Sequence, residues 1–361
     1  MIKTNRLSFL PFLAVMLICA LAGCKGNGGS NGKKTILTPA STGNPYEVLV
    51  VADPEDFQKK AYNALFEVLD DDVPGLPQSE SQFKVSKVTT DGFYRTLRFC
   101  RNIILVKIDP MYSQGKIKFS RDVYSTPQMI MTIQAGSDAQ FADFVTKNAD
   151  QITGFFKTAE MNREIERLKS RHSLVISEKV QKQFGCDIWM PQELTKMKTA
   201  KDFFWASTNK GEKDMNFVIY SYPYTDVNTF TEKYCLDKRD SVMKVNIPGP
   251  KEGQYMTTTR PPFVKVTDGV VKNEYAQIAR GLWEMENYDM GGPFVSISRV
   301  DVKNQRVIVV EGFVYAPGDL KKNLMRRLEA ALYTLQLPDE IDAEHFNYDI
   351  DEVTIEPESL K

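Results

Sequence analysis

From residue 45 onward the chain alternates between short apolar runs and stretches whose apolar residues recur every three or four positions. Residues 46–52 predict a strand, and the pattern that follows, to about residue 70, predicts an amphipathic helix. Ser137 opens a helical stretch that continues to about residue 184, with an expected interruption at Gly154. Turn residues separate the extended segments of this first half, which are 83–89, 102–108, 117–123 and 128–134.

The second half repeats this plan, with a helix expected at 227–242 and another between Pro317 and Pro338. Because its strands also occur in runs beside helices, we expect an α+β fold rather than a doubly wound parallel sheet. The prediction is two similar halves, 45–184 and 185–337, each a mostly antiparallel sheet packed with helices. The strands expected in the second half are 186–190, 203–207, 216–222, 263–267, 275–285, 294–301 and 306–315.

Two charged segments stand out, one at the end of the first half and one after the second half. The helical stretch from Glu160 to Lys182 is expected to brace the two halves, in preference to serving as a partner-binding helix. Residues 338–361 contain nine acids against the single base Lys361 and predict a loosely packed acidic tail, in which 347–355 could add an edge strand.

The N-terminus has the order of a lipoprotein signal peptide. Two basic residues precede an apolar run at 9–22, whose 14 residues are fewer than the ~20 that span a bilayer. The run ends in Leu21-Ala22-Gly23-Cys24, which resembles the lipobox of bacterial lipoproteins. We therefore predict a signal peptide at 1–23 and a diacylglyceryl group on the Cys24 thiol, with an acyl chain such as palmitate on its freed amine. The alternatives are an ordinary secreted protein cleaved nearby and an uncleaved anchor.

Residues 24–44 are rich in Gly, Asn and Ser and predict a flexible tether. Lys25, rather than Asp, follows the lipidated cysteine, which favours the outer membrane over retention at the inner membrane. The absence of acidic residues just after Cys24 favours the periplasmic face.

The charge balance argues against one class of partner. Lys plus Arg total 46 and Asp plus Glu total 47, a net charge of −1 that gives no reason to expect nucleic acid. Removing residues 1–23 removes two bases and no acid, so the remaining chain has 46 − 2 = 44 bases against 47 acids. Its net charge of −3 argues against attachment to anionic lipid by charge.

Cysteine and histidine offer little chemistry. Cys100, Cys186 and Cys235 are far apart, and either two of them form a disulfide or all three are buried thiols. His172 and His345 are too far apart to suggest a shared metal site, and neither a G-x-S-x-G nor a P-loop motif occurs. We therefore predict no catalytic residue, metal or cofactor from motifs.

The stretch 280–294 combines aromatic residues with glycines. Gly291-Gly292 before Pro293 predicts a special turn. One interpretation is a binding groove, and the alternative is a hairpin core with a surface ion pair. The groove would be lined by Trp283, Tyr288 and Phe313, with Arg280, Glu284 and Glu311 as polar residues.

Two functions follow from these features. The first is a non-catalytic envelope protein, tethered through lipid on Cys24, that binds a partner protein or a glycan. The second is an envelope hydrolase in which Glu284 and Glu311 are paired carboxylates ~5–9.5 Å apart. An open sheet edge or an apolar patch at the site would favour the first.

Several short sequence segments resemble a family of Bacteroidetes lipoproteins known only as a domain of unknown function (DUF4837-like). The resemblance runs over about residues 45–337, and it implies a lipid-anchored envelope protein with no assigned catalytic residues. It rests on Gly92-Phe93-Tyr94, Arg101-Asn102, Arg280-Gly281-Leu282-Trp283, Gly291-Gly292-Pro293-Phe294 and the segment 311–317.

Overall fold

The computed structural model describes residues 38–341 and 349–350, and the chain from Thr38 onward forms one compact unit. The predicted signal peptide, Cys24, His345 and most of the acidic tail lie outside the described residues. Glu340 does not lie in a loose tail, because its carboxylate pairs with the guanidinium of Arg299, whose side chain is 2% exposed.

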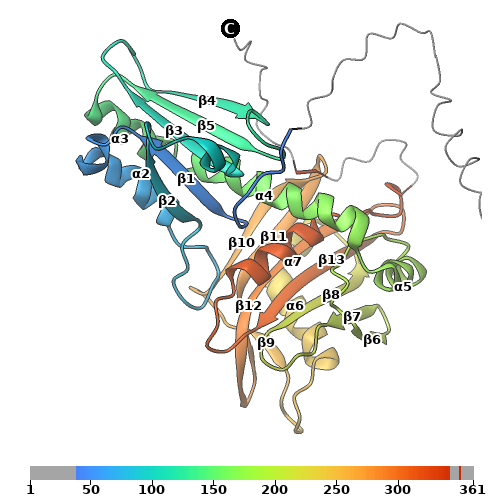
Figure 1. Cartoon of the computed structure of the whole chain (residues 1–361). Coiled ribbons are helices and arrows are strands. Elements are labelled where there is room, and N and C mark those ends of the chain that lie inside the picture. The colour runs from blue at the N-terminus through green and yellow to red at the C-terminus, as the bar shows by residue number, and fades with distance from the viewer. Residues whose placement is uncertain (1–37, 342–348, 351–361) are drawn as a thin grey trace, which may run out of the picture. The chain divides into compact units, whose positions relative to one another are not determined.

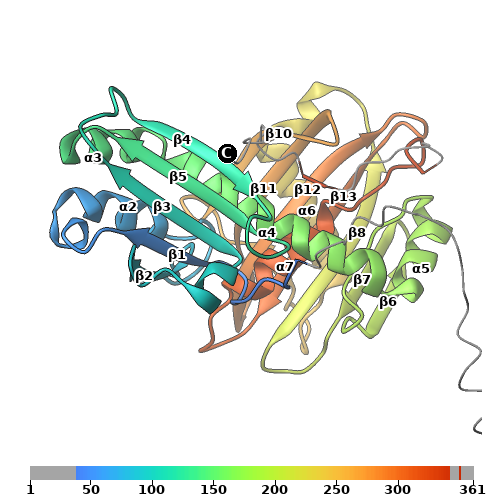
Figure 2. The same ribbon diagram turned by 45° about the horizontal axis from the view of Figure 1, so that its top comes forward.

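The first half is a five-stranded sheet in the order β2-β1-β3-β5-β4 (Figure 2). Its core lies between one face of the sheet and α2, α3 and α4. The elements are β1 (Glu47–Ala52), η1 (Asp56–Gln58), α2 (Ala61–Asp70), β2 (Lys84–Thr89), η2 (Arg95–Phe99), β3 (Asn102–Ile108), β4 (Lys116–Arg121), β5 (Met129–Ala135), α3 (Asp138–Lys147) and α4 (Ala149–Arg171).

The strand directions of this sheet correct the sequence prediction. β1 pairs with β2 and β3 in parallel, β3 pairs with β5 in parallel, and only the β4–β5 pair is antiparallel among the described strands. Parallel neighbours need long connections. The segment between β2 and β3, which contains η2, is long enough to return the chain across the sheet, and α2 links β1 to β2. The pattern of apolar residues shows the strands but not these crossovers.

The second half is an eight-stranded sheet, antiparallel throughout its pairings as predicted. One face packs against α4, α5 and α7, and the other against α6, so the sheet has a core on each side (Figure 1). The elements are α5 (Leu174–Phe184), β6 (Lys196–Ala200), β7 (Phe203–Ser207), β8 (Asp214–Pro223), η3 (Val227–Phe230), α6 (Glu232–Asn246), β9 (Met256–Thr258), β10 (Val264–Val271), β11 (Glu274–Met285), β12 (Tyr288–Asp301), β13 (Arg306–Tyr315) and α7 (Lys322–Leu332). The α+β class is confirmed.

Helix α4 joins the two halves, as the bracing interpretation predicted. Phe155 and Phe156 are buried in the core of the first half, whereas Ile165 and Leu168 are buried in the core of the second. The helix runs from one sheet to the other in both ribbon views (Figures 1 and 2). The break expected at Gly154 is absent, since this residue lies inside α4, and the helical stretch is interrupted at Asn148 and after Arg171 instead.

The loop between α2 and β2 also fastens the halves together. The carboxylate of Glu80, a residue that is 5% exposed, accepts the backbone N–H groups of Lys321 and Lys322 at 2.7 and 2.9 Å. These are N–H groups at the start of α7, where a carboxylate is stabilised by both hydrogen bonds and the helix dipole. Arg326 of α7 donates back to the carbonyl oxygen of Gln82 at 2.8 Å. The relative position of the two halves is therefore fixed by buried polar contacts.

Candidate functional site

The aromatic residues of the predicted groove form a core instead. Trp283 and Phe313 are 2% and 3% exposed, and their rings meet edge to face with centroids 5.5 Å apart. The indole N–H of Trp283 donates to the carbonyl oxygen of Val314 at 3.2 Å. Tyr288 is 43% exposed and belongs to neither buried cluster of the sheet. The groove prediction is therefore wrong for Trp283 and Phe313, and the hairpin-core alternative describes them.

The two glycines before Pro293 lie within β12 rather than in a turn. The hairpin turns at Glu286-Asn287, where Asn287 has a φ of 55°. A Cβ at Gly292 would lie 2.0 Å from the carbonyl oxygen of Val314, and one at Gly291 would lie 2.8 Å from the carbonyl oxygen of Trp283. Glycine is required here for close strand packing rather than for a positive φ.

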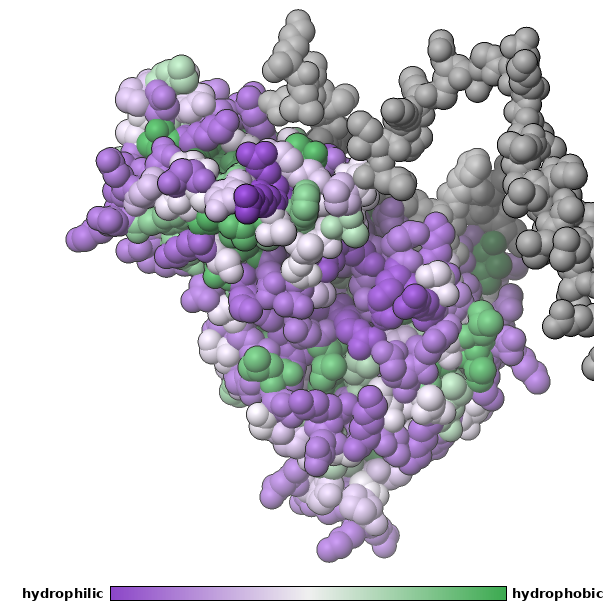
Figure 3. Space-filling view, in the orientation of Figure 1, coloured by the Kyte–Doolittle hydropathy of each residue, from purple (hydrophilic) through white to green (hydrophobic). Residues whose placement is uncertain are grey.

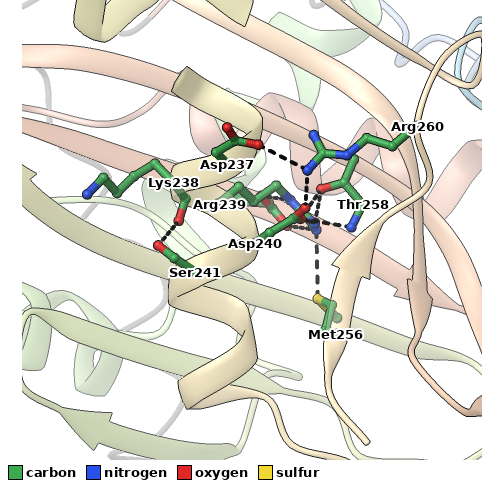
Figure 4. Close-up of polar contacts among 9 residues, drawn as sticks. Asp237, Lys238, Arg239, Asp240, Ser241, Met256, Thr258 and Arg260 are labelled. Carbon is green, nitrogen blue, oxygen red and sulfur yellow. Dashed lines mark hydrogen bonds and ion pairs between the residues drawn. The ribbon is translucent and has the colours of Figure 1, made fainter. Parts of the chain in front are cut away.

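Glu311 is fully buried and paired with Arg239 of α6. The guanidinium donates to both carboxylate oxygens, from Nε at 2.9 Å and from Nη2 at 2.7 Å. Its Nη1 donates to Thr258 Oγ1 at 2.8 Å, and Thr258 in turn donates to Asp240 (Figure 4). Arg260 closes this network by donating to Asp240 at 2.7 Å. Burial raises the pKa of the Glu311 carboxyl, and the charge of Arg239 opposes that shift. Because Arg239 and Glu311 are 1% and 0% exposed, the pair has a structural role.

The carboxylates proposed for a hydrolase do not converge. Glu311 faces α6, where it meets Arg239, and Trp283 and Met285 face the same side. Side chains alternate between the faces of a strand, so Glu284, which is exposed between these two residues, points to the opposite face. Arg280 also faces away from α6, since it pairs with Glu329 of α7. The structure therefore separates Glu284 from Glu311 and Arg280 from Glu311.

Arg280 lies instead in a cleft of about 750 Å³ between the two halves. Helix α7 contacts β12, β13 and β8 of the second sheet. The cleft lies beside α7, over the neighbouring strands β10 and β11. The opposite wall is α4 and the loop after α2. The surface at this junction is mostly hydrophilic (Figure 3). The charged lining residues are Asp71, Asp150, Lys157, Lys265, Arg280, Arg326 and Glu329.

One ion pair and four exposed charged side chains line the cleft. Arg280 forms an ion pair with Glu329. Burial of Glu329 works against ionisation, but Arg280 outweighs it and lowers the pKa of the Glu329 carboxyl. Lys157 and Lys265 are exposed and form no ion pair with the described residues. Asp71 and Asp150 are also exposed, so the rim offers charges of both signs to a ligand.

The cleft also contains an open sheet edge. β10 ends the strand order β10-β11-β12-β13-β8-β7-β6 of the second sheet, and Lys265 and Thr267 of β10 line the cleft. Outside its pairing with β11, the described residues supply no backbone hydrogen bond to residues 264–271. Phe263, immediately before β10, is 55% exposed. An edge of this kind can pair with an added extended segment.

The remaining candidate groups are structural among the described residues. Cys100, Cys186 and Cys235 are all free thiols, and burial raises the pKa of Cys186 and of Cys235 to about 12. His172 is half-buried and stacks on Trp189. Within the described ranges, no group of three or more His, Cys, Asp or Glu residues could hold a metal ion. No helix of the described chain is both long and apolar enough to cross a membrane.

Comparisons place each half in a different class of domain. Residues 173–334 match the domain of unknown function DUF4837, and residues 41–169 match a second domain of unknown function, DUF8532. The resemblance to DUF4837 is thus confirmed for the second half. It does not extend to the first half, where Gly92-Phe93-Tyr94 and Arg101-Asn102 fall within the other domain.

No curated protein matches the chain. Among solved structures, the chain is similar to the lipid transfer and protein localization domain of human StarD13 (DLC2), with 8% identity and a TM-score of 0.20. The alignment covers 44% of this chain and 91% of that domain. A similarity of this size does not establish a shared fold.

The predicted groove and the cleft share one residue, Arg280. Lys157 looks like any charged residue of an amphipathic helix, and Glu329 like any polar residue of α7. Phe263 stands at the start of a predicted strand, where an apolar residue is ordinary. No local signal marks these residues, because they meet only through the docking of α4, α7 and β10.

Proposed function

We propose that the protein is a non-catalytic, lipid-anchored binding protein of the cell envelope, and that its cleft accepts an extended segment of a partner protein. Lipid on Cys24 holds it at the outer membrane, facing the periplasm. The leader and the tetrapeptide Leu21-Ala22-Gly23-Cys24 support the anchor. The observation that carries the binding role is the open edge of β10 inside the cleft.

A protein segment suits this cleft better than a glycan does. Glycans are commonly bound against exposed aromatic rings. The cleft lining has two aromatic residues, and only Phe263 is exposed, because Phe294 is 1% exposed. An extended peptide gains main-chain hydrogen bonds from an edge strand, and its side chains supply specificity. Lys157 and Lys265 can pair with acidic side chains of that peptide, and Asp71 and Asp150 with basic ones. Hydrolysis by paired carboxylates is not favoured, because Glu284 and Glu311 face opposite sides of the sheet.

Photo-crosslinking in the native envelope tests this proposal. A photoreactive phenylalanine analogue replaces Phe263 in the full chain, and a matched variant carries it at Val245, which is 75% exposed on α6. We expect a discrete adduct from position 263 that Lys265→Glu reduces at least fivefold, because the substitution reverses a charge at the rim.

The control at Val245 decides whether such an adduct is specific. Identical adducts from the two positions, or an adduct at 263 that Lys265→Glu does not change, would contradict binding in the cleft.

A further inference from the structure

The outer face of the first sheet carries a row of basic side chains. Ile104 and Val106 of β3 point into the helix-covered core, so Leu105 and Lys107 point to the other face. The register places Lys107 and Lys116 on either side of Gln134, and Leu105 and Lys118 on either side of Thr132. Three lysines from two strands therefore share one surface.

The segment η2 extends this surface. Phe93, just before η2, is 9% exposed and packs on Leu49, Val51, Ile103 and Ile130, which belong to the same outer face. The guanidinium of Arg98 lies 5.9 Å from the Phe93 ring and 5.5 Å from the Tyr124 ring, and Arg95 is exposed. Tyr94 and Leu97 are 54% and 37% exposed. We call the residues Arg95, Arg98, Lys107 and Lys116 the basic face.

The acids that flank the basic face bind backbone groups beside them. Asp91 accepts the N–H of Gly92 at 3.0 Å, Asp109 that of Met111 at 2.9 Å, and Asp122 that of Gln128 at 2.7 Å. Among the described residues, these three acids lie beside four bases, so the surface keeps a positive excess although the chain without residues 1–23 has a net charge of −3.

The described chain begins beside this surface. The N–H of Thr42 donates to the carbonyl oxygen of Phe99, the last residue of η2, at 2.7 Å, and the carbonyl oxygen of Pro39 accepts the N–H of Thr126 at 2.8 Å. Only residues 25–37 separate Cys24 from this point, and even a fully extended chain of that length reaches no more than ~50 Å. A lipid on Cys24 would hold η2 and its neighbours nearest the bilayer.

We propose that the basic face docks on an anionic lipid surface. Lysine and arginine side chains meet the phosphate groups of the lipids, and Tyr94 and Leu97 enter the interfacial region, where tyrosine is favoured. The overall negative charge does not oppose this, because surface charges beyond ~8 Å are screened at physiological salt. This docking is independent of the cleft and of any partner in it.

Co-sedimentation with lipid vesicles tests the docking without the anchor. The chain from Lys25 onward retains the compact unit that begins at Thr38 and can be used unlipidated. We expect it to sediment with vesicles containing phosphatidylglycerol, to bind phosphatidylcholine vesicles at least tenfold less, and to be released by 0.5 M salt. The variant Arg95→Glu/Lys107→Glu/Lys116→Glu is expected to lose at least tenfold in binding, since each charge contributes about fivefold.

A matched control separates the effect of charge on the basic face from the effect of the net charge of the chain. Lys210→Glu/Lys251→Glu/Lys303→Glu changes the net charge equally, at exposed positions in the second half. It is expected to bind as the unchanged chain does, with both variants showing the same thermal midpoint. Equal loss in the two variants, equal binding to neutral vesicles, or binding to a soluble polyanion without binding to vesicles would overturn the proposal.

Discussion

Replacing Glu311 by Gln is expected to lower the free energy of unfolding by about 3–5 kcal/mol. The substitution leaves the guanidinium of Arg239, a residue that is 1% exposed, without its counter-charge in the core between α6 and the sheet. Removing one partner of a buried ion pair costs this much because the remaining charge stays desolvated. Urea denaturation at pH 7 measures the loss.

The double variant Arg239→Met/Glu311→Leu is the control for this prediction. It removes both charges and keeps apolar volume beside Phe294, over which the guanidinium lies at 4.0 Å. We expect it to be more stable than Glu311→Gln, although Thr258 then loses one hydrogen-bond partner. A loss below about 1 kcal/mol for Glu311→Gln would show that the pair is not buried as described.

The variant Gly292→Ala is expected to lose about 3 kcal/mol or more of stability. The added methyl group would lie 2.0 Å from the carbonyl oxygen of Val314, which also accepts the indole N–H of Trp283. The backbone of β12 or β13 must then move. Forced backbone shifts in a packed core typically cost about 1–3 kcal/mol and sometimes more, and we expect the upper end here because the methyl group meets backbone rather than a flexible side chain.

Gly154→Ala in α4 is the matched control. A Cβ at Gly154 meets nothing within 4 Å, so we expect a gain of about 0.5–1 kcal/mol from the greater helix propensity of alanine. If Gly292→Ala falls within 0.5 kcal/mol of the unchanged chain in the same urea series, the close approach of β12 and β13 is wrong.

The sequence was informative where a feature depends on local periodicity. The range 102–108 coincides with β3, 306–315 coincides with β13, and Ser137 is the N-cap of α3, with Oγ accepting the N–H of Gln140. The brace was also predictable, since the apolar residues of α4 change face along the helix. Ile152, Phe155, Phe156 and Ala159 enter the core of the first half, whereas Met161, Ile165 and Leu168 enter that of the second. Apolar spacing does not encode strand direction, and so the parallel pairing of the first sheet was missed.

The candidate site could be predicted only in part. Arg280, which lies in the cleft, belongs to a distinctive segment of the sequence. Trp283, Phe313 and Glu311 are equally distinctive in sequence, but they are buried in the core. Dense packing of the second sheet requires aromatic residues, glycines and a buried ion pair in the same neighbourhood. Such a segment looks like a binding site in sequence, whereas the cleft is formed by ordinary residues of three distant elements.

Both proposals place a folded body beside a membrane, and the state of one sulfur atom tests this most directly. Mass spectrometry of the mature protein from its native envelope should give an N-terminal peptide that begins at Cys24. Its thiol should carry a diacylglyceryl group and its amine an acyl chain. A peptide with residues 1–23 still attached, or a mature Cys24 with a bare thiol, would contradict the account.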